Sequence, residues 1–497
     1  MNVPLKQPKN ADVPALSLTW YRYASLIFVL KFVLLIIDPL PKFYLGDSFS
    51  YIYTAITGWI PEDRSYFYGF VIRWLALSSE SFTSLLIVQV SLGGLIAILA
   101  ARISWQIFKL PLWGSFAVGV LCCIDPLQLL WERAVMTETI SLFFYGALLH
   151  RSFIYLKRRR IIDLVAVQLL SILLIGFRMS YLALVTMLAV ALPILAFTPV
   201  SLRSSLRLLS VARESIWAFG RKLEIPVVHF VVSVGAMLVL HQAYKTANGV
   251  LSHRPPDYLY GTGFHLLSFW APVIEPDDAA DPRLRELIER GGEFHIKERS
   301  ARLTQRFYRG FLVDRWCKVE PDVRRANEIA KKTALRALKR HPRAVALLAW
   351  HTYMDHWGAK AIKRYASVDL KMGSFTEAEV HLLAQRFHYA LTSRNLAAEP
   401  LTFTKRYYIA AYPYYFVILL LPAISATTLF IPGIGKRYAG SLFLQTIAQF
   451  GSTFVLTATP VVRYLQPLSL LTILTVALVA KVIAGNVNRI PKTKLVE

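Results

Sequence analysis

Five ionisable residues stand beside apolar segments, although they are far apart in the chain. Asp47 and Arg64 follow the first apolar run, Glu138 opens the fourth, and Arg178 and Arg463 each separate two successive runs. A charge next to hydrocarbon is costly, so such residues are candidates for function. Guanidinium groups bind phosphate through paired N–H donors, and a carboxylate accepts a proton. These residue types therefore favour a site that holds an anion and takes up a proton.

Structural roles are open for the acids as well. Asp47, in the segment GDS, fits the start of a helix, and Asp125 before Pro126 fits a turn or a cap. Glu132 and Glu138 are six residues apart and would not share one face of a straight helix. We therefore expect one of these two glutamates to face the site and the other to pair with an arginine of a neighbouring element.

The arginines have a structural alternative too. Arg178 and Arg463 lie in short connections between expected spans, and the topology given below places both connections on the exterior side. Short exterior connections normally avoid Lys and Arg, so both arginines are unusual there. Either one alone fits an ion pair with Asp125, Glu132 or Glu138. The two together, opposite a cluster of acids, favour an anion, and a phosphate group matches the guanidinium fork.

The composition is that of a polytopic membrane protein. Of 497 residues, 55% are hydrophobic and 18% are charged, with a mean hydropathy of +0.45. In a membrane protein, a net charge of +25 is explained by basic cytoplasmic loops, which are attracted to the anionic head groups of the lipid bilayer. Nucleic acid is therefore not an expected partner. The cysteines Cys122, Cys123 and Cys317 offer neither a disulfide framework nor a paired-cysteine metal site.

The apolar runs predict an all-α fold with about ten transmembrane helices, since a span needs about 20 apolar residues. The expected spans are roughly 20–37, 82–103, 112–130, 136–155, 161–177, 179–199, 225–241, 407–431, 438–459 and 466–485. The basic stretches 157–160 and 203–222 are expected to be cytoplasmic.

This topology divides the chain into three parts. Residues 1–240 form an N-terminal transmembrane module whose first exterior loop, 38–81, carries Asp47. Residues 241–406 form a mostly helical exterior, or periplasmic, domain, with helical spacing around a break at Pro342. Residues 407–497 supply the C-terminal transmembrane helices. The site is expected on the exterior face of the membrane.

Several common catalytic motifs are missing. The sequence has no Walker loop, no GxSxG elbow and no GxGxxG, which argues against an ATP-driven pump, an α/β hydrolase and a Rossmann enzyme. No HExxH or comparable spacing occurs among the histidines. The sequence therefore identifies no cofactor and leaves a divalent metal open.

An ordered series of segments resembles the GT-C superfamily of integral membrane glycosyltransferases. The series is DRSYFYGFVIR, QVSLGGLIAILAARI, DPLQLLWERAVMTETI, GFRMSYLAL and VVRYLQPLSLL, after a first loop with Asp47. It is most similar to the bacterial branch with protein O-mannosyltransferases and the lipid A aminoarabinose transferase. The resemblance covers about the first 200 residues, the last third of the exterior domain and the RY…P segment. It implies transfer of a sugar from a polyprenyl-phosphate carrier to a glycan, lipid or protein acceptor, in the cell inner membrane and on its periplasmic face.

The resemblance also implies roles for individual residues. Asp47 and Glu138 would be catalytic carboxylates, one in the first loop and one opening the fourth span. The residues expected to bind substrate are Arg64, Tyr68, Asp125, Glu132, Arg178, Arg463 and Tyr464, with Arg178 and Arg463 on the carrier phosphate. Many relatives carry two adjacent acids early in the first loop, whereas Ser48 follows Asp47 here and the adjacent pair is Glu62 and Asp63. This departure weakens a metal assignment.

The chemistry can also be argued without the resemblance. A sugar phosphate already contains a good leaving group, so the reaction needs one base and fixed positive charge near the departing phosphate. A single displacement would invert the anomeric centre. Two other functions remain open: an O-antigen ligase or polymerase, with its essential residues in the large exterior loop, and a lipid-linked sugar flippase or transporter.

Overall fold

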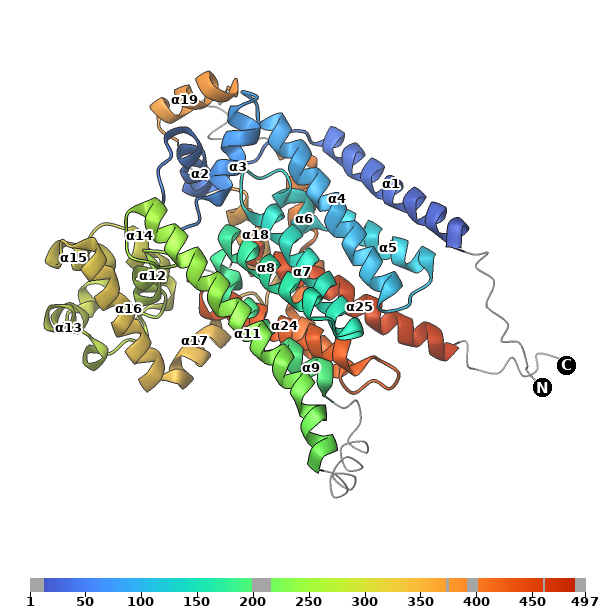
Figure 1. Cartoon of the computed structure of the whole chain (residues 1–497). Helices are drawn as coiled ribbons and strands as arrows, with labels where there is room; N and C mark the ends of the chain where they lie inside the picture. Colours follow the sequence, from blue (N-terminus) through green and yellow to red (C-terminus); the bar gives the residue numbers. More distant parts are fainter. Residues whose placement is uncertain (1–12, 199–215, 372–374, 391–400, 459–460, 488–497) are drawn as a thin grey trace, which may run out of the picture.

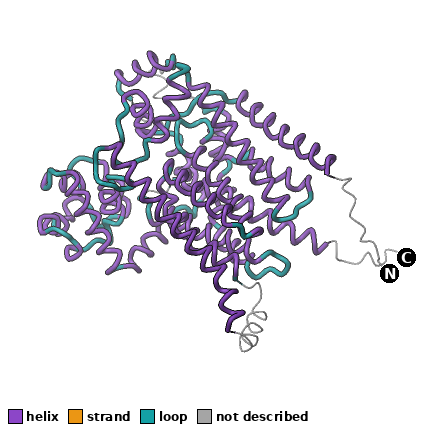
Figure 2. The backbone as a smooth tube through the Cα atoms, viewed as in Figure 1, coloured by secondary structure: helices purple, strands orange, loops and turns teal. Residues whose placement is uncertain are grey.

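The computed structural model describes residues 13–198, 216–371, 375–390, 401–458 and 461–487. Within these ranges the regular structure is helical (Figure 2), and β-type pairing is limited to an isolated bridge between Lys42 and Ala134. The basic stretch 203–222, used above to orient the chain, lies largely outside the described ranges. Five described helices are long and apolar enough to cross a membrane: Leu18–Ile37, Phe82–Gln106, Met179–Phe197, Glu224–Ser252 and Val462–Ala484.

Long helices form the bundle at the centre of the molecule (Figure 1). Its members are α1 (Val13–Ile37), α4 (Phe82–Gln106), α5 (Leu112–Cys123), α7 (Glu138–Arg158), α8 (Ile161–Phe177), α9 (Leu182–Phe197), α11 (Ile216–Ser252), α24 (Lys436–Val455) and α25 (Gln466–Val487). α4 packs against α1, α5 and α7, α8 packs between α7 and α11, and α9 packs against α11 and α24. Apolar side chains on nearly every face suit helices that are surrounded by other helices and by lipid.

The remaining expected spans are helical but shorter, interrupted or more polar. Region 112–130 divides into α5 and α6 (Pro126–Trp131), and region 407–431 divides into α21 (Phe403–Ala410), α22 (Tyr412–Leu419) and α23 (Leu421–Thr428). Pro126, Pro413 and Pro422 stand at the starts of α6, α22 and α23, where the missing proline N–H costs nothing. α8 is a shorter apolar helix, and ten crossings stay a prediction.

The first loop and a short helix from later in the chain cover one end of the bundle. The loop contains α2 (Leu45–Thr57) and α3 (Phe67–Ile72), which continues as a π-helical turn, η2 (Arg73–Leu77). α2 ends at Gly58, whose φ of 78° places it in the left-handed region that favours glycine. α19 (Glu377–Phe387) lies over this end (Figure 1), with Phe387 stacked on Phe82 at 4.6 Å between ring centroids.

A second lobe with its own core lies beside the bundle (Figure 1). It contains α12 (Thr262–Phe269), α13 (Pro282–Glu289), α14 (Arg302–Phe307), α15 (Leu312–Val319), α16 (Val323–Arg340) and α17 (Pro342–Met354), with 3-10 turns at Pro276–Asp278, Gly291–Phe294 and Arg299–Ala301. Phe264, Phe294, Trp316 and Ala330 are buried at its centre. The break at Pro342 is as predicted, because proline begins α17.

The predicted boundaries of the exterior domain differ from those of this lobe. Residues 241–252 continue α11, because the apolar span runs on as one helix. α18 (Ala359–Asp369) packs on η7 (Val462–Leu465) and α22, and Ile362 and Ala366 belong to the core of the bundle. The chain after α17 therefore returns to the bundle end and packs on the segment that carries Arg463.

Candidate functional site

Backbone contacts fix the start of the first loop against the loop before α7. The N–H of Lys42 donates to the Arg133 carbonyl at 2.7 Å, and the Lys42 carbonyl accepts from Val135 N–H at 2.8 Å. Gln89 of α4 donates to the carbonyls of Glu132 and Ala134. These contacts place the start of α2 next to the start of α7, and therefore Asp47 near Glu138.

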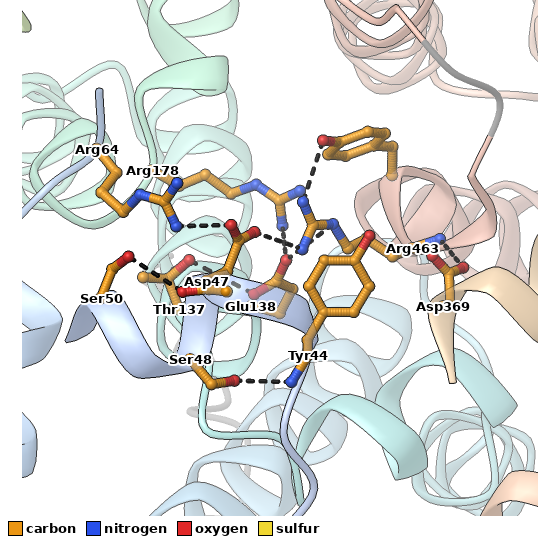
Figure 3. A network of polar contacts seen from close by, with 12 residues as sticks. Tyr44, Asp47, Ser48, Ser50, Arg64, Thr137, Glu138, Arg178, Asp369 and Arg463 are labelled. Atoms are coloured by element: carbon orange, nitrogen blue, oxygen red, sulfur yellow. Dashed lines mark hydrogen bonds and ion pairs between the residues drawn. The ribbon is translucent and has the colours of Figure 1, made fainter. Parts of the chain in front are cut away.

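Asp47 does not cap its helix. It lies in the first turn of α2, whose N-cap is Tyr44. The Tyr44 N–H donates to Ser48 Oγ at 2.8 Å and not to Asp47. The Asp47 carboxylate accepts from two arginines, from Arg64 Nη1 at 2.6 Å and from Arg463 Nη1 at 3.2 Å (Figure 3). The helix-cap alternative for Asp47 is therefore wrong.

Two arginines approach Glu138 from different elements (Figure 3). Arg178 Nη1 lies 3.4 Å and Arg463 Nε lies 3.7 Å from the same Glu138 oxygen, Oε1. Arg178 follows the last residue of α8 in extended backbone, and Arg463 lies on the 3-10 turn η7. Tyr464 accepts a hydrogen bond from Arg463 at 3.1 Å, and Arg178 lies over its ring. We call Asp47, Glu138, Arg64, Arg178 and Arg463 the arginine–carboxylate cluster.

Burial and charge both act on this cluster. The side chains of Glu138, Arg463 and Arg178 are 2%, 10% and 11% exposed, and that of Asp47 is 27% exposed. Burial tends to raise the pKa of Asp47, but the charges of Arg64 and Arg463 hold it below its usual range. Asp47 and Glu138 both lie in first turns, where the helix dipole favours a negative charge. Both features keep Asp47 ionised at neutral pH.

Two donors of the cluster have no hydrogen-bond partner among the described residues. Arg178 Nη1 and Arg463 Nε are buried and unbonded, since their contacts with Glu138 are ionic and long. A buried guanidinium N–H without an acceptor is costly, and such groups are normally satisfied. The arrangement can therefore accept an anion between the two arginines.

Three residues expected to bind substrate lie outside the cluster. Asp125 caps α6 by accepting hydrogen bonds from the N–H groups of Leu127 and Gln128. It therefore has the capping role that the sequence offered as the alternative to substrate binding. Glu132 is fully buried and forms an ion pair with Lys31 at 2.6 Å, because its side chain points into the bundle between α1 and α4. Tyr68 is fully buried and donates to Gln89 at 2.6 Å. Its ring packs edge-on against Tyr51 and supports the loop from behind.

Other polar residues join the site without a clear sequence signal. Asp63 accepts two hydrogen bonds from Arg64, at 2.9 and 3.0 Å, and so fixes the fork that reaches Asp47. Tyr44 lies under the Arg463 guanidinium, with 4.1 Å from Cζ to the ring centroid. Asp369 of α18 accepts from the backbone N–H of Arg463 at 2.9 Å. Of these three residues, the sequence drew attention to Asp63 alone, as a member of the adjacent acidic pair Glu62 and Asp63.

The donor set does not fit a resident divalent metal. Across the described ranges, no three His, Cys, Asp or Glu side chains come together as metal ligands. Asp47 and Glu138 are both engaged by guanidinium groups, so their oxygens face positive charge.

The fold and the site define a helical protein with helices of membrane-spanning length and an arginine–carboxylate cluster at one end of its bundle. Among known proteins, no family model, no curated protein and no solved structure matches the chain.

Proposed function

We propose that this protein is a membrane glycosyltransferase of the GT-C type. It would move a sugar from a polyprenyl-phosphate-linked donor to an acceptor on the exterior face of the inner membrane. The observation that carries the proposal is the pair of unbonded, buried donors, Arg178 Nη1 and Arg463 Nε, which converge on one oxygen of Glu138. Two guanidinium groups with open donors are suited to a phosphate.

The proposed reaction is a single displacement. The acceptor hydroxyl oxygen bonds to the anomeric carbon, the bond from that carbon to the phosphate oxygen breaks, and polyprenyl phosphate leaves. Asp47 takes the hydroxyl proton as general base, and Arg178 and Arg463 stabilise the charge that grows on the leaving phosphate. Inversion at the anomeric carbon follows, because this step uses no enzyme nucleophile.

Because Asp47 is held in ion pairs, the lipid-linked sugar donor would help to activate it as the base. A carboxylate held by Arg64 and Arg463 is a weak base, since both charges lower its pKa. A phosphate bound by Arg463 would compete for that guanidinium and weaken its bond to Asp47. Donor binding would therefore raise the basicity of Asp47 and prepare it for the acceptor.

The test separates binding from turnover. Purified full-length protein in nanodiscs is assayed for undecaprenyl phosphate binding, and for polyprenyl phosphate release from a panel of lipid-linked sugars with envelope glycolipids as acceptors. Asp47→Asn should keep binding and lower release by at least about 100-fold, the lower range of a general base. Arg463→Gln should weaken binding by about tenfold, the effect of one charge-assisted contact. Asp163→Asn is the matched control, since Asp163 pairs with Arg151 outside the cluster.

Two results would replace this proposal. Full turnover in a folded Asp47→Asn variant would favour a ligase or polymerase whose essential residues lie in the large exterior loop. Movement of the sugar carrier across reconstituted vesicles without its consumption would favour a flippase.

A further inference from the structure

An arginine without a carboxylate partner lies in the second lobe, next to the first loop. Arg306 of α14 has its Cζ 5.5 Å from the ring centroid of Phe264 and 5.2 Å from that of Phe307. Its Nε is buried and has no hydrogen-bond partner, and no ion pair joins its guanidinium to another side chain in the described part of the chain. A partly buried charge is normally paired, so an unpaired one is suited to a ligand of opposite charge.

The loop that carries Asp63 is fixed against the start of α12. The carbonyl of Glu62 accepts from the N–H groups of Tyr260 and Gly261, both at 2.9 Å, and the Glu62 carboxylate pairs with Arg254. A Cβ added at Gly261 would lie 3.4 Å from the backbone of Asp63. The two segments therefore keep one relative position.

Electrostatics connects Arg306 with the arginine–carboxylate cluster. Burial lowers the pKa of Arg306, and the charge of Asp63 opposes that effect, so Asp63 lies within electrostatic range. Asp63 is bonded by Arg64, which also bonds Asp47. A path of charged groups thus runs from Arg306 to the proposed base.

His265 adds a neutral acceptor to this surface. Burial lowers the pKa of His265, and the charge of Arg306 lowers it further, which favours the neutral ring. Its Nδ1 lies 2.9 Å from the Gly261 carbonyl, which accepts only, so Nδ1 carries the proton. Nε2 is then an acceptor for a hydroxyl group.

Two exposed aromatic residues directly follow Arg306 in the chain, and the first of them, Phe307, also lies next to His265. Phe307 is 53% exposed and Tyr308 is 60% exposed, directly after Arg306 in the chain. Exposed aromatic rings stack on the apolar faces of sugar rings. We call Arg306, His265, Phe307 and Tyr308 the Arg306 surface.

We infer that the Arg306 surface is an acceptor-binding site for an anionic saccharide, one that carries a phosphate or a carboxylate. The guanidinium pairs with the anionic group, His265 Nε2 accepts a hydrogen bond from a sugar hydroxyl, and the exposed aromatic rings stack on the apolar face of the sugar ring. A saccharide held there would extend over Asp63 toward Asp47. The acceptor role rests on the proposed function, but the binding of an anionic sugar does not.

The test uses soluble probes with full-length protein in phosphatidylcholine nanodiscs. Saturation-transfer NMR measures the affinity of glucose 6-phosphate, glucuronate and methyl glucoside. The two anionic sugars should bind more tightly than methyl glucoside, and Arg306→Gln should weaken them by about tenfold. Arg309→Gln is the matched control, because Arg309 is exposed two residues beyond α14. Arg306→Lys keeps the charge and should bind with intermediate affinity, which also shows that replacement at this position leaves the lobe folded.

Separate outcomes address the site and the function. Equal losses in Arg306→Gln and Arg309→Gln, or equal affinity for all three probes, would overturn the site. Loss of probe binding in phosphatidylglycerol nanodiscs would assign the surface to lipid head groups and overturn the acceptor role. Probe binding without any sugar transfer would leave the anionic site standing and remove the proposed function. Transfer that is unchanged in Arg306→Gln would leave the proposed function standing and remove the acceptor role of the Arg306 surface.

Discussion

Asp369 is a buried carboxylate held by hydrogen bonds, and it predicts a measurable pH dependence of stability. It is 4% exposed, and its Oδ2 accepts from the backbone N–H of Arg463 at 2.9 Å and from the Tyr408 hydroxyl at 2.8 Å. Its Oδ1 is buried and accepts no hydrogen bond from the part of the chain that the structure describes. Burial raises the pKa of Asp369 from the ordinary 3.8 to about 7, although Tyr408 and Arg463 oppose the change.

The size and sign of the effect follow from this shift. The difference between 3.8 and about 7 corresponds to about 4 kcal/mol of unfolding free energy. Because the folded state binds the proton more tightly, the contribution of Asp369 is fully present below pH 4. It falls as the pH rises to about 7, with a slope of at most about 1.4 kcal/mol per pH unit, and is level above that.

Asp369→Asn removes this titration and keeps a carbonyl oxygen for the N–H of Arg463. The unfolding free energy of the variant, relative to the natural chain, should therefore increase between pH 4 and pH 7 by up to about 4 kcal/mol. Denaturant unfolding of the full-length protein in mild detergent, at a series of pH values, measures the difference. Asp277→Asn is the control, because Asp277 is exposed and paired with Arg285. Parallel pH curves for Asp369→Asn and the natural chain would refute the reasoning.

Two further predictions concern stability. Lys31→Met should cost about 3–5 kcal/mol of unfolding free energy, because it leaves Glu132 buried and unpaired, whereas Lys31→Met combined with Glu132→Leu should recover most of that loss; a single variant that unfolds like the natural chain would contradict this. Gly263→Ala should destabilise the second lobe by about 1–3 kcal/mol, because its Cβ would lie 2.0 Å from the Asn327 carbonyl oxygen, whereas Gly292→Ala meets no atom within 4 Å and should be neutral. Limited proteolysis of the lobe checks the second pair, and equal cleavage of both variants would count against it.

Part of the site could be predicted from the sequence. Asp47, Glu138, Arg64, Arg178, Arg463 and Tyr464 were all expected at one site, and the structure brings them together. The reason is topological: charges at the ends of successive apolar runs can meet only at one of two ends of a bundle. The same logic located Asp125 and Glu132 at that end, but a position along the helix axis does not say which way a side chain points.

The choice of partners was decided by tertiary packing. Asp47 and Arg463 are separated by 416 residues, and their contact depends on η7 being held by Asp369 of α18. Glu132 pairs with Lys31 because α1 lies against α4 and α5. No local pattern marks Lys31 or Asp369, since each needs neighbours from other helices to become important.

The sequence by itself determined the helical, apolar character of the chain and the residue types available for chemistry, because both depend on composition and spacing along one segment. The structure alone decided which carboxylate meets which arginine, which buried donors stay unbonded and where Arg306 lies relative to the first loop. These features depend on the relative positions of helices, and those positions arise from packing of the whole chain at once.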